Sequence, residues 1–285
     1  LIFFHSCLAS SFPPVCLLMD NSIPVALTIA GSDSSGGSGI QADLKTFQMF
    51  GVYGCSAITC VTAQNTLGIV SQECLASQLL EDQLEAVLTD IKPSALKTGM
   101  LGTAPLVELV AYTIKKRSLK NYVLDPVMVS TSGHSLLDHE GRKLLREKLI
   151  PLAQIVTPNL HEVRKLTGHD IDGPDKIKAA AEEFLRMGAS SVLIKGGHFE
   201  EGLATDFLLT AQTEKTWSRP LLKTTAGHGT GCTLAAALVA ELAKGTDLCT
   251  ATEKAISFVN RALASSPMLG RGSSPINHFV DLKPR

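Results

Sequence analysis

Residues 25–50 of the chain read VALTIAGSDSSGGSGIQADLKTFQMF. The run Val25–Ala30 is short, apolar and rich in β-branched residues, which is typical of a buried strand, and a glycine-rich segment follows it. Apolar side chains then recur at helical spacing up to Gly51, at Ile40, Leu44, Phe47 and Phe50. The stretch therefore predicts a strand, a glycine-rich loop and a helix.

The same alternation continues to the end of the chain. Further strands are predicted at 56–63, 95–100, 121–129, 154–159 and 191–197, and a hairpin at 204–210 and 214–218. Helices are predicted at 80–91, 103–117, 139–150, 160–167, 175–187, 229–245 and 247–266. Strands that alternate with helices imply right-handed crossovers, so we expect an α/β fold with a mostly parallel sheet.

Composition bounds the class of protein. The 285 residues are 45% hydrophobic and 19% charged, which excludes a disordered chain and a disulfide-dominated miniprotein. No repeat or linker interrupts the pattern, so we predict one domain over residues 20–285. Because 26 basic residues balance 27 acidic ones and aromatics are only 5%, we expect no nucleic-acid partner and no membrane span, but a small-molecule partner.

The cysteines and the N-terminus suggest where the protein resides. Seven cysteines without a CxxC pair predict reduced thiols in the cytoplasm or an organellar matrix, and no disulfide or zinc framework. Residues 1–19 are apolar but lack the basic start of a signal peptide and contain Pro13-Pro14. They are interpreted as an extension outside the domain, either a translated upstream stretch before Met19 or an incomplete targeting segment, and we expect them to be dispensable.

Polar and glycine-rich clusters follow nearly every predicted strand. In an open parallel sheet the carboxyl ends of the strands share one edge, where ligands bind. The clusters are Gly31–Gly39, Ala63–Asn65, Gly99-Met100, Asp125-Pro126, Thr157–Asn159, Lys195–Gly197 and Gly227–Cys232. Their shared position predicts a single ligand site.

The segment Gly227–Cys232 is the strongest candidate among these clusters. Its glycines let backbone N–H groups converge at the start of a helix, which predicts a cradle for an anion or a phosphate, although a tight packing turn would use the same residues. Cys232 lies at that helix N-terminus, where a lowered thiol pKa is expected; the alternative is a small buried thiol that fills space. The other glycine-rich segment, 31–39, matches neither a dinucleotide fingerprint nor a Walker loop.

Seven motifs, in order, resemble the hydroxymethylpyrimidine and hydroxymethylpyrimidine-phosphate kinases of thiamine biosynthesis, in the ribokinase-like superfamily. They are GSDSSGGSGIQADLKTF, VTAQNT, KTGML, VLDPVM, TPNLHE, IKGGH and GHGTGCT, and the resemblance covers about residues 24–280. It implies a three-layer αβα sandwich, usually a homodimer, that transfers the γ-phosphoryl group of ATP with Mg²⁺ to the hydroxymethylpyrimidine and then to its monophosphate.

The resemblance also assigns site residues. It implies a pyrimidine pocket formed by Gly31, Asp43, Gln64, Met100 and Val127. An anion hole would consist of Gly229, Thr230, Gly231 and Cys232, with Cys232 taking the proton of the acceptor hydroxyl. ATP would contact Asn159, Lys195 and Thr225, and Mg²⁺ would bind Asp125 and Glu162.

Residue chemistry supports some of these roles and leaves others open. A carboxamide such as Gln64 can pair with the donor and the adjacent ring acceptor of an aminopyrimidine. Taken alone, Asp43 could be a solvated surface carboxylate, Gln64 a loop cap, and Lys195 and Glu162 an ordinary surface salt bridge. The alternatives for function are a pyridoxal kinase of the same superfamily and a non-catalytic pyrimidine-binding module; a dinucleotide-dependent oxidoreductase lacks the fingerprint spacing.

Overall fold

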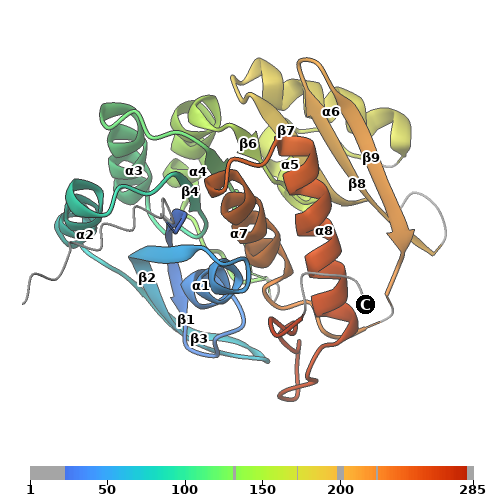
Figure 1. The fold of residues 1–285 in the computed structure, drawn as a ribbon, viewed down its shortest axis with the longest axis horizontal. Helices are drawn as coiled ribbons and strands as arrows, with labels where there is room; N and C mark the ends of the chain where they lie inside the picture. Colours follow the sequence, from blue (N-terminus) through green and yellow to red (C-terminus); the bar gives the residue numbers. More distant parts are fainter. Residues whose placement is uncertain (1–22, 131–132, 172, 198–201, 223, 281–285) are drawn as a thin grey trace, which may run out of the picture.

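A computed structural model describes residues 23–130, 133–171, 173–197, 202–222 and 224–280 (Figure 1). Its centre is a nine-stranded sheet with the order β3-β2-β1-β4-β5-β6-β7-β8-β9. The six strands from β2 to β7 in this order are parallel, β3 is antiparallel at one edge, and β8 and β9 are antiparallel at the other. The strands are β1 (Val25–Asp33), β2 (Tyr53–Asn65), β3 (Gly68–Cys74), β4 (Ala95–Thr98), β5 (Tyr122–Leu124), β6 (Ile155–Val156), β7 (Ser191–Gly197), β8 (Leu203–Thr210) and β9 (Glu214–Pro220).

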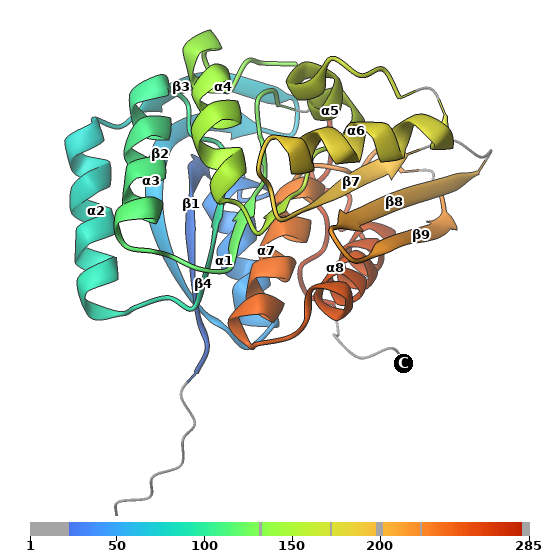
Figure 2. The same cartoon turned by 90° about the horizontal axis from the view of Figure 1, so that it is seen from above.

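Helices cover both faces of the sheet and complete three αβα layers (Figures 1 and 2). One face carries α1 (Gly39–Met49), α7 (Thr230–Ala243) and α8 (Leu248–Ala264). The other carries α2 (Ser77–Asp90), α3 (Ala104–Lys116), α4 (His139–Leu144), α5 (Leu160–Thr167) and α6 (Pro174–Arg186). The predicted α/β class with a mostly parallel sheet, and the sandwich implied by the resemblance, are confirmed.

Two hydrophobic cores hold the layers together, one on each side of the sheet. Residues Thr233–Leu242 of helix α7 are all buried between the sheet and the neighbouring helices. The helix can be buried in this way because its sequence is apolar on nearly all sides. This burial fixes the axis of α7, so its N-terminus has a defined position at the carboxyl edge of the sheet. In the described ranges no helix has the length and apolarity needed to cross a membrane.

Among the elements that differ from the sequence prediction, two bear on the site. The strand expected at 121–129 is only Tyr122–Leu124, and the chain after it forms a loop that reaches the carboxyl edge. Strand β3 (Gly68–Cys74) was not predicted, because several of its side chains are exposed and its sequence GIVSQEC lacks a continuous apolar face.

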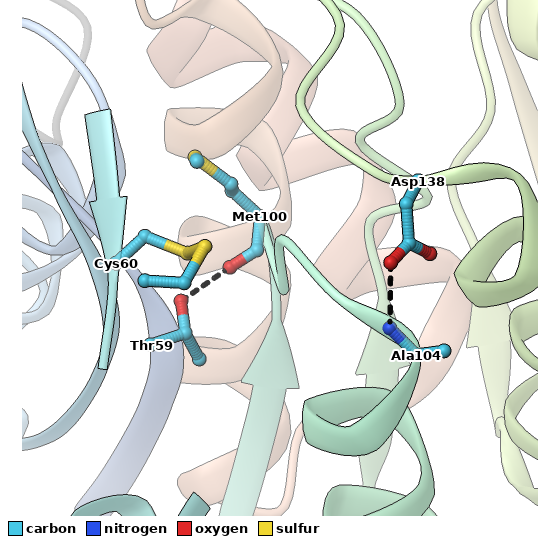
Figure 3. Close-up of a disulfide and its surroundings, with 6 residues drawn as sticks. Thr59, Cys60, Met100, Ala104 and Asp138 are labelled. Atoms are coloured by element: carbon cyan, nitrogen blue, oxygen red, sulfur yellow. Dashed lines mark hydrogen bonds between the residues drawn. A yellow bond between two sulfur atoms is a disulfide. The ribbon is translucent and has the colours of Figure 1, made fainter. Parts of the chain in front are cut away.

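The prediction that all cysteines are reduced thiols is wrong for Cys60 and Cys74. Cys60 on β2 lies directly opposite Cys74 on β3, and the two form a disulfide (Figure 3). Because β3 was not predicted, nothing in the sequence pattern placed these cysteines opposite each other. Gly102 packs against both sulfurs, since a Cβ atom there would overlap each of them. Cys55, Cys232 and Cys249 are free.

The order of the strands creates the crevice for a ligand. The chain passes from β1 outward to β2 and then returns to add β4 on the other side of β1. Loops on the two sides of such a switch point diverge and leave space at the carboxyl ends of the strands. The predicted extension at residues 1–19 lies outside the described residues.

Candidate active site

A cavity of about 170 Å³ opens at this carboxyl edge. The ends of β1, β2 and β7, the start of β3, the loops after β1, β4, β5 and β6, and the N-terminus of α7 all contribute to its wall. Twelve of the fourteen predicted site residues line it: Gly31, Gln64, Met100, Asp125, Val127, Asn159, Glu162, Lys195, Gly229, Thr230, Gly231 and Cys232. The edge of the sheet therefore brings together residues that are up to 201 positions apart in sequence, from Gly31 to Cys232.

The N-terminus of α7 forms one end of the cavity. Its N-cap, Gly229, has φ +86°, a left-handed conformation that glycine adopts readily, and a Cβ atom there would overlap the carbonyl oxygen of Gly37. The amides of Gly231 and Cys232 belong to the first turn, where N–H groups have no acceptor within the helix. Together with the helix dipole, these amides make this end of the cavity suited to an anion.

A cluster of charged side chains lies next to that helix end. Lys195 Nζ donates to Asp125 Oδ1 at 3.0 Å, and it lies 3.3 Å from the point that a Cβ atom on Gly231 would occupy. Burial opposes the charge on Lys195, but Asp125 and Glu162 outweigh it and raise its pKa. Lys195 is therefore a fixed positive charge beside the anion-binding end of α7.

Glu162 is held by a capping box at the start of α5. Asn159 N donates to Glu162 Oε2 at 2.8 Å, and Glu162 N donates to Asn159 Oδ1 at 2.9 Å. Burial raises the pKa of Glu162 to about 7; Lys195 opposes this shift and Asp125 adds to it. The site thus contains two buried acidic side chains beside one lysine, and a bound cation would favour the ionised form of Glu162.

These carboxylates fit a magnesium ion bound together with nucleotide phosphates. Asp125 and Glu162 offer hard oxygen ligands, and Mg²⁺ in kinases is usually held by one or two carboxylates, phosphate oxygens and water. Within the described ranges no cluster of three or more His, Cys, Asp or Glu side chains could hold a metal without such help. The residues present therefore suit a metal that arrives with a phosphate ligand.

The other end of the cavity combines an amide with an apolar wall. Gln64 comes from the end of β2, and the apolar side chains around it are Ile69, Met100, Val127 and Leu136. The backbone at Met100 is fixed because Thr59 Oγ1 donates to its carbonyl oxygen at 2.7 Å (Figure 3). A Cβ atom on Gly31 would lie 2.9 Å from Met100 Sδ, so glycine leaves the room that the methionine occupies. This end suits a flat, partly polar ring.

Asp43 and Thr225 do not line the cavity. Asp43 is fully buried in α1, where it accepts hydrogen bonds from Lys97 at 2.8 Å and Thr28 at 2.6 Å. A buried carboxylate needs a partner, and the ion pair with Lys97 provides one. Asp43 therefore stabilises the protein interior and does not line the cavity. Thr225 is exposed in the segment that leads to the loop before α7. In the described part of the chain, neither residue is positioned to contact a ligand in this cavity.

The lowered thiol pKa expected for Cys232 is also wrong. Cys232 does line the cavity at the N-terminus of α7, but burial raises its pKa to about 11; Lys97 opposes this shift, and Asp43 and Asp125 add to it. Desolvation of a thiolate therefore exceeds the stabilisation offered by the helix end and the lysine. At neutral pH the thiol is protonated.

Three polar residues in or next to the site were not predicted. Lys97 is fully buried, and its pKa is raised because Asp43, Cys232 and Asp125 outweigh the effect of burial. Asp33 and His228 are buried and hydrogen-bonded to each other at 2.7 Å. A lysine within the buried run Ala95–Thr98 and a histidine inside a glycine cradle are signals that could have indicated them.

Comparisons with known proteins agree with this geometry. The model of the family described as phosphomethylpyrimidine kinase matches residues 33–277. A hydroxymethylpyrimidine/phosphomethylpyrimidine kinase of Bacillus subtilis (strain 168) is 47% identical over 260 residues, which cover 91% of this chain and 96% of the relative. The namesake from Staphylococcus aureus (strain MRSA252) is 43% identical over 261 residues, covering 91% and 95%.

Solved structures extend the comparison to the fold. The ADP complex of a Bacillus subtilis pyridoxal kinase is 39% identical with a TM-score of 0.83 and covers 90% of this chain and 98% of that one. A phosphomethylpyrimidine kinase from Clostridium difficile 630 is 42% identical with a TM-score of 0.75 and covers 84% and 98%. On its sequence, its ribokinase-like fold and the match over residues 33–277, the chain belongs to the phosphomethylpyrimidine kinase family.

Proposed function

We propose that this kinase transfers the γ-phosphoryl group of ATP, with Mg²⁺, to the hydroxymethyl oxygen of 4-amino-5-hydroxymethyl-2-methylpyrimidine and then to the resulting monophosphate. The observation that carries the proposal is the polarity of the cavity. A carboxamide over an apolar wall lies at one end, and a lysine, two carboxylates and a helix N-terminus lie at the other. The acceptor ring and the phosphoryl group would therefore occupy opposite ends of one cavity.

The acceptor end would bind the ring through Gln64. A carboxamide can accept from the exocyclic amine and donate to the adjacent ring nitrogen, while Met100 and Val127 pack against the ring. Such a ring would leave its hydroxymethyl group directed toward the start of α7. The apolar wall excludes water from the space where the two reactants meet.

The phosphoryl end would stabilise negative charge. Lys195 and the first amides of α7 would contact the transferring group and the leaving phosphates, with Asn159 beside them. Mg²⁺, when bound by Asp125 and Glu162, would neutralise charge on the phosphate oxygens. Removal of a single such donor typically costs about 10²–10³-fold in rate.

Cys232 would exchange a proton with the acceptor. This role is supported by its position in the cavity wall at the N-terminus of α7. With its pKa raised to about 11, the thiol is neutral at rest, so a base role requires that it lose its own proton first. Lys97 is close enough to favour the thiolate electrostatically.

Pyridoxal is a second candidate acceptor. Solved pyridoxal kinases from Bacillus subtilis and Staphylococcus aureus match this chain with TM-scores of 0.83, although at 39% and 34% identity. Pyridoxal also carries a hydroxymethyl group on a six-membered ring, so the same phosphoryl end would serve it. It lacks an amine beside a ring nitrogen, however, so Gln64 would lose one of its two expected hydrogen bonds.

A coupled assay that follows ADP release tests the proposal, with the hydroxymethylpyrimidine, its monophosphate and pyridoxal measured side by side. We expect substrate-dependent turnover with both pyrimidines at a kcat/KM at least ten times that for pyridoxal. Turnover with pyridoxal alone would replace the proposed substrate. Binding of the pyrimidine without any ATP turnover would instead indicate a non-catalytic binding module.

We also propose the wider context of this activity. Residues 20–285 would form the single kinase domain, and the use of ATP and Mg²⁺ suits a cytoplasmic location. A homodimer is supported by the exposed apolar side chains Val61, Leu67 and Val70 on the ribbon formed by β2 and β3.

A further inference from the structure

Asp33 and His228 join two segments of the cavity wall. Asp33 ends β1, and His228 precedes the N-cap of α7. His228 Nε2 lies 2.7 Å from Asp33 Oδ2, within hydrogen-bond distance, and the two side chains are only 8% and 3% exposed. Backbone packing joins the same segments, because a Cβ atom on Gly37 would overlap the ring of His228.

Asp33 can only accept hydrogen bonds in this arrangement. Its carboxylate accepts from the backbone N–H groups of Ser35 at 2.8 Å and Ser38 at 2.8 Å, and from both serine hydroxyls. Burial opposes its ionisation, but hydrogen bonds from His228 and Ser35 outweigh burial and hold its pKa well below the usual range. Since an ionised carboxylate has no proton to give, Nε2 of His228 must carry one.

This proton restricts the orientation of the Gln64 amide. The structure places Gln64 Nε2 3.4 Å from His228 Nε2 and Gln64 Oε1 3.3 Å from Thr62 Oγ1. The nitrogen and oxygen of an amide are nearly equal in size, so the hydrogen-bond partners decide which of the two faces His228. An NH₂ group facing an N–H group would be a contact between two donors. A carbonyl oxygen facing His228 removes this conflict, and it turns the amide nitrogen toward Thr62.

Thr62 can accept the hydrogen bond that this orientation requires. Its hydroxyl donates to the carbonyl oxygen of Ser32 at 2.9 Å, so its lone pairs remain available for a donor. The one proton on His228 Nε2 is directed mainly at Asp33, 2.7 Å away, so the Gln64 oxygen would be its second and weaker acceptor at 3.4 Å, while one amide N–H would point toward Thr62. The remaining lone pair and remaining N–H of Gln64 are left for a ligand in the cavity.

We propose that Asp33 and His228 are positioning residues that set the Gln64 amide in one orientation and thereby select an acceptor that carries an amine beside a ring nitrogen. The selection follows from the order of donor and acceptor along the amide. A ring in the productive pose must place its amine on the oxygen side and its ring nitrogen on the nitrogen side. This inference deepens the proposed function and rests on it.

The test is a double-mutant cycle on binding of the hydroxymethylpyrimidine, measured by calorimetry without ATP. Gln64→Ala, His228→Leu and the double variant are compared with the wild type, and His228→Gln restores a side-chain N–H close to the position of Nε2. Loss of one oriented hydrogen bond should raise the Kd about three- to tenfold in His228→Leu. In the Gln64→Ala background the same change should alter the Kd less than twofold.

Kinetics separate a positioning role from a structural one. His228→Leu should raise the KM for the pyrimidine and leave the KM for ATP unchanged, and His228→Gln should recover most of the loss. The exposed His139, at the start of α4, provides a matched control, and His139→Leu should change neither KM. Pyridoxal turnover should be less sensitive to His228→Leu, because that ring keeps only one of the two hydrogen bonds to Gln64.

The outcomes distinguish the two proposals. If the wild type neither binds nor phosphorylates the pyrimidine, the proposed function fails. If the wild type does both, but the effects of Gln64→Ala and His228→Leu on the Kd simply multiply, His228 does not act through Gln64 and the inference is overturned. The inference also fails if His228→Leu raises both KM values equally, because that pattern would indicate a general loosening of the loops.

Discussion

Cys232 illustrates how the surroundings of one residue change its chemistry. Its position at a helix N-terminus favours a thiolate, yet burial dominates and raises its pKa to about 11. The protonated thiol cannot accept a proton from the acceptor, whereas the thiolate formed from it is a strong base. Its contribution should therefore depend on pH and on whether the acceptor has a proton to lose.

We expect Cys232→Ala to slow phosphorylation of the alcohol by about 10²-fold or more, since a positioned base contributes about 10²–10⁴-fold. The monophosphate is already largely dianionic at pH 7, because its second pKa is near 6, so its phosphorylation should change little. The thiolate is the active form, and the pKa of the thiol is about 11. The rate at which the wild type phosphorylates the alcohol should therefore rise with pH from 7 to 9. Single-turnover rates of each step across this range provide the measurement.

Two results would count against a base role for Cys232. A flat pH profile for the alcohol would mean that its ionisation is not required. If Cys232→Ala slowed phosphorylation of the alcohol and of the monophosphate equally, the side chain would instead shape the anion-binding end of the cavity. Cys249→Ala, which removes a free and partly buried thiol at the start of α8, is the control and should leave both rates unchanged.

Gly229 gives a second prediction at the level of one residue. Gly229→Ala forces a side chain onto a backbone with φ +86° and against the carbonyl oxygen of Gly37. The loop must shift, so the amides at the start of α7 should lose their alignment, and kcat should fall about 10²–10³-fold. Gly245→Ala, also at positive φ but with open space around its Cβ position, is the control for backbone strain. A similar loss of kcat in both variants would contradict the alignment argument.

Among the secondary-structure elements, those that the sequence predicted well are the ones with a continuous buried face. Helix α1, for example, was predicted from Ile40 and Phe47, and both are buried against the sheet. Strand β3 escaped prediction because it lies at the edge of the sheet, and its pairing with β2 depends on backbone hydrogen bonds that leave no hydrophobic pattern. The disulfide escaped for the same reason.

The disulfide between Cys60 and Cys74 should stabilise the β2–β3 ribbon. It closes a loop with a sequence separation of 14, for which chain entropy predicts about 3 kcal/mol. We expect the double variant Cys60→Ala and Cys74→Ala to melt about 5–10 °C below the wild type in calorimetry, given the size of the domain. A dithiol reductant should lower the melting temperature of the wild type by a similar amount.

The reductant also supplies the internal control for this prediction. The double variant should not respond to it, whereas Cys249→Ala should respond like the wild type, because Cys249 is a free thiol. A wild-type melting temperature that is unchanged by the reductant would show that the two cysteines are not joined in solution. Because Ile69 on β3 lines the cavity, pyrimidine affinity can be followed in the same samples.

At the scale of the whole molecule, the parallel sheet explains why the site could be located from sequence. Every predicted polar cluster followed a strand, and parallel strands end at one edge, so placement alone brought Gln64, Asp125 and Lys195 into one cavity. The sequence pattern could not show which of these side chains line the cavity and which are buried beneath it. Asp43 lies on the first helix near this edge, but its pairing with the buried Lys97 removes it from the cavity wall, and a pairing across 54 residues leaves no local signal.

The last prediction concerns assembly and rests on the surface of the β2–β3 ribbon. Val61, Leu67 and Val70 are 47%, 61% and 80% exposed, and β3 is an edge strand, so a monomer would leave both apolar surface and strand edge uncovered. We expect a homodimer in sedimentation equilibrium, and Val70→Glu should shift it toward monomer by placing a charge in the contact. Tyr112→Glu, at a 56% exposed position on α3, should leave the dimer intact. If the wild type sediments as a monomer, or Val70→Glu remains as dimeric as Tyr112→Glu, the ribbon is not the interface.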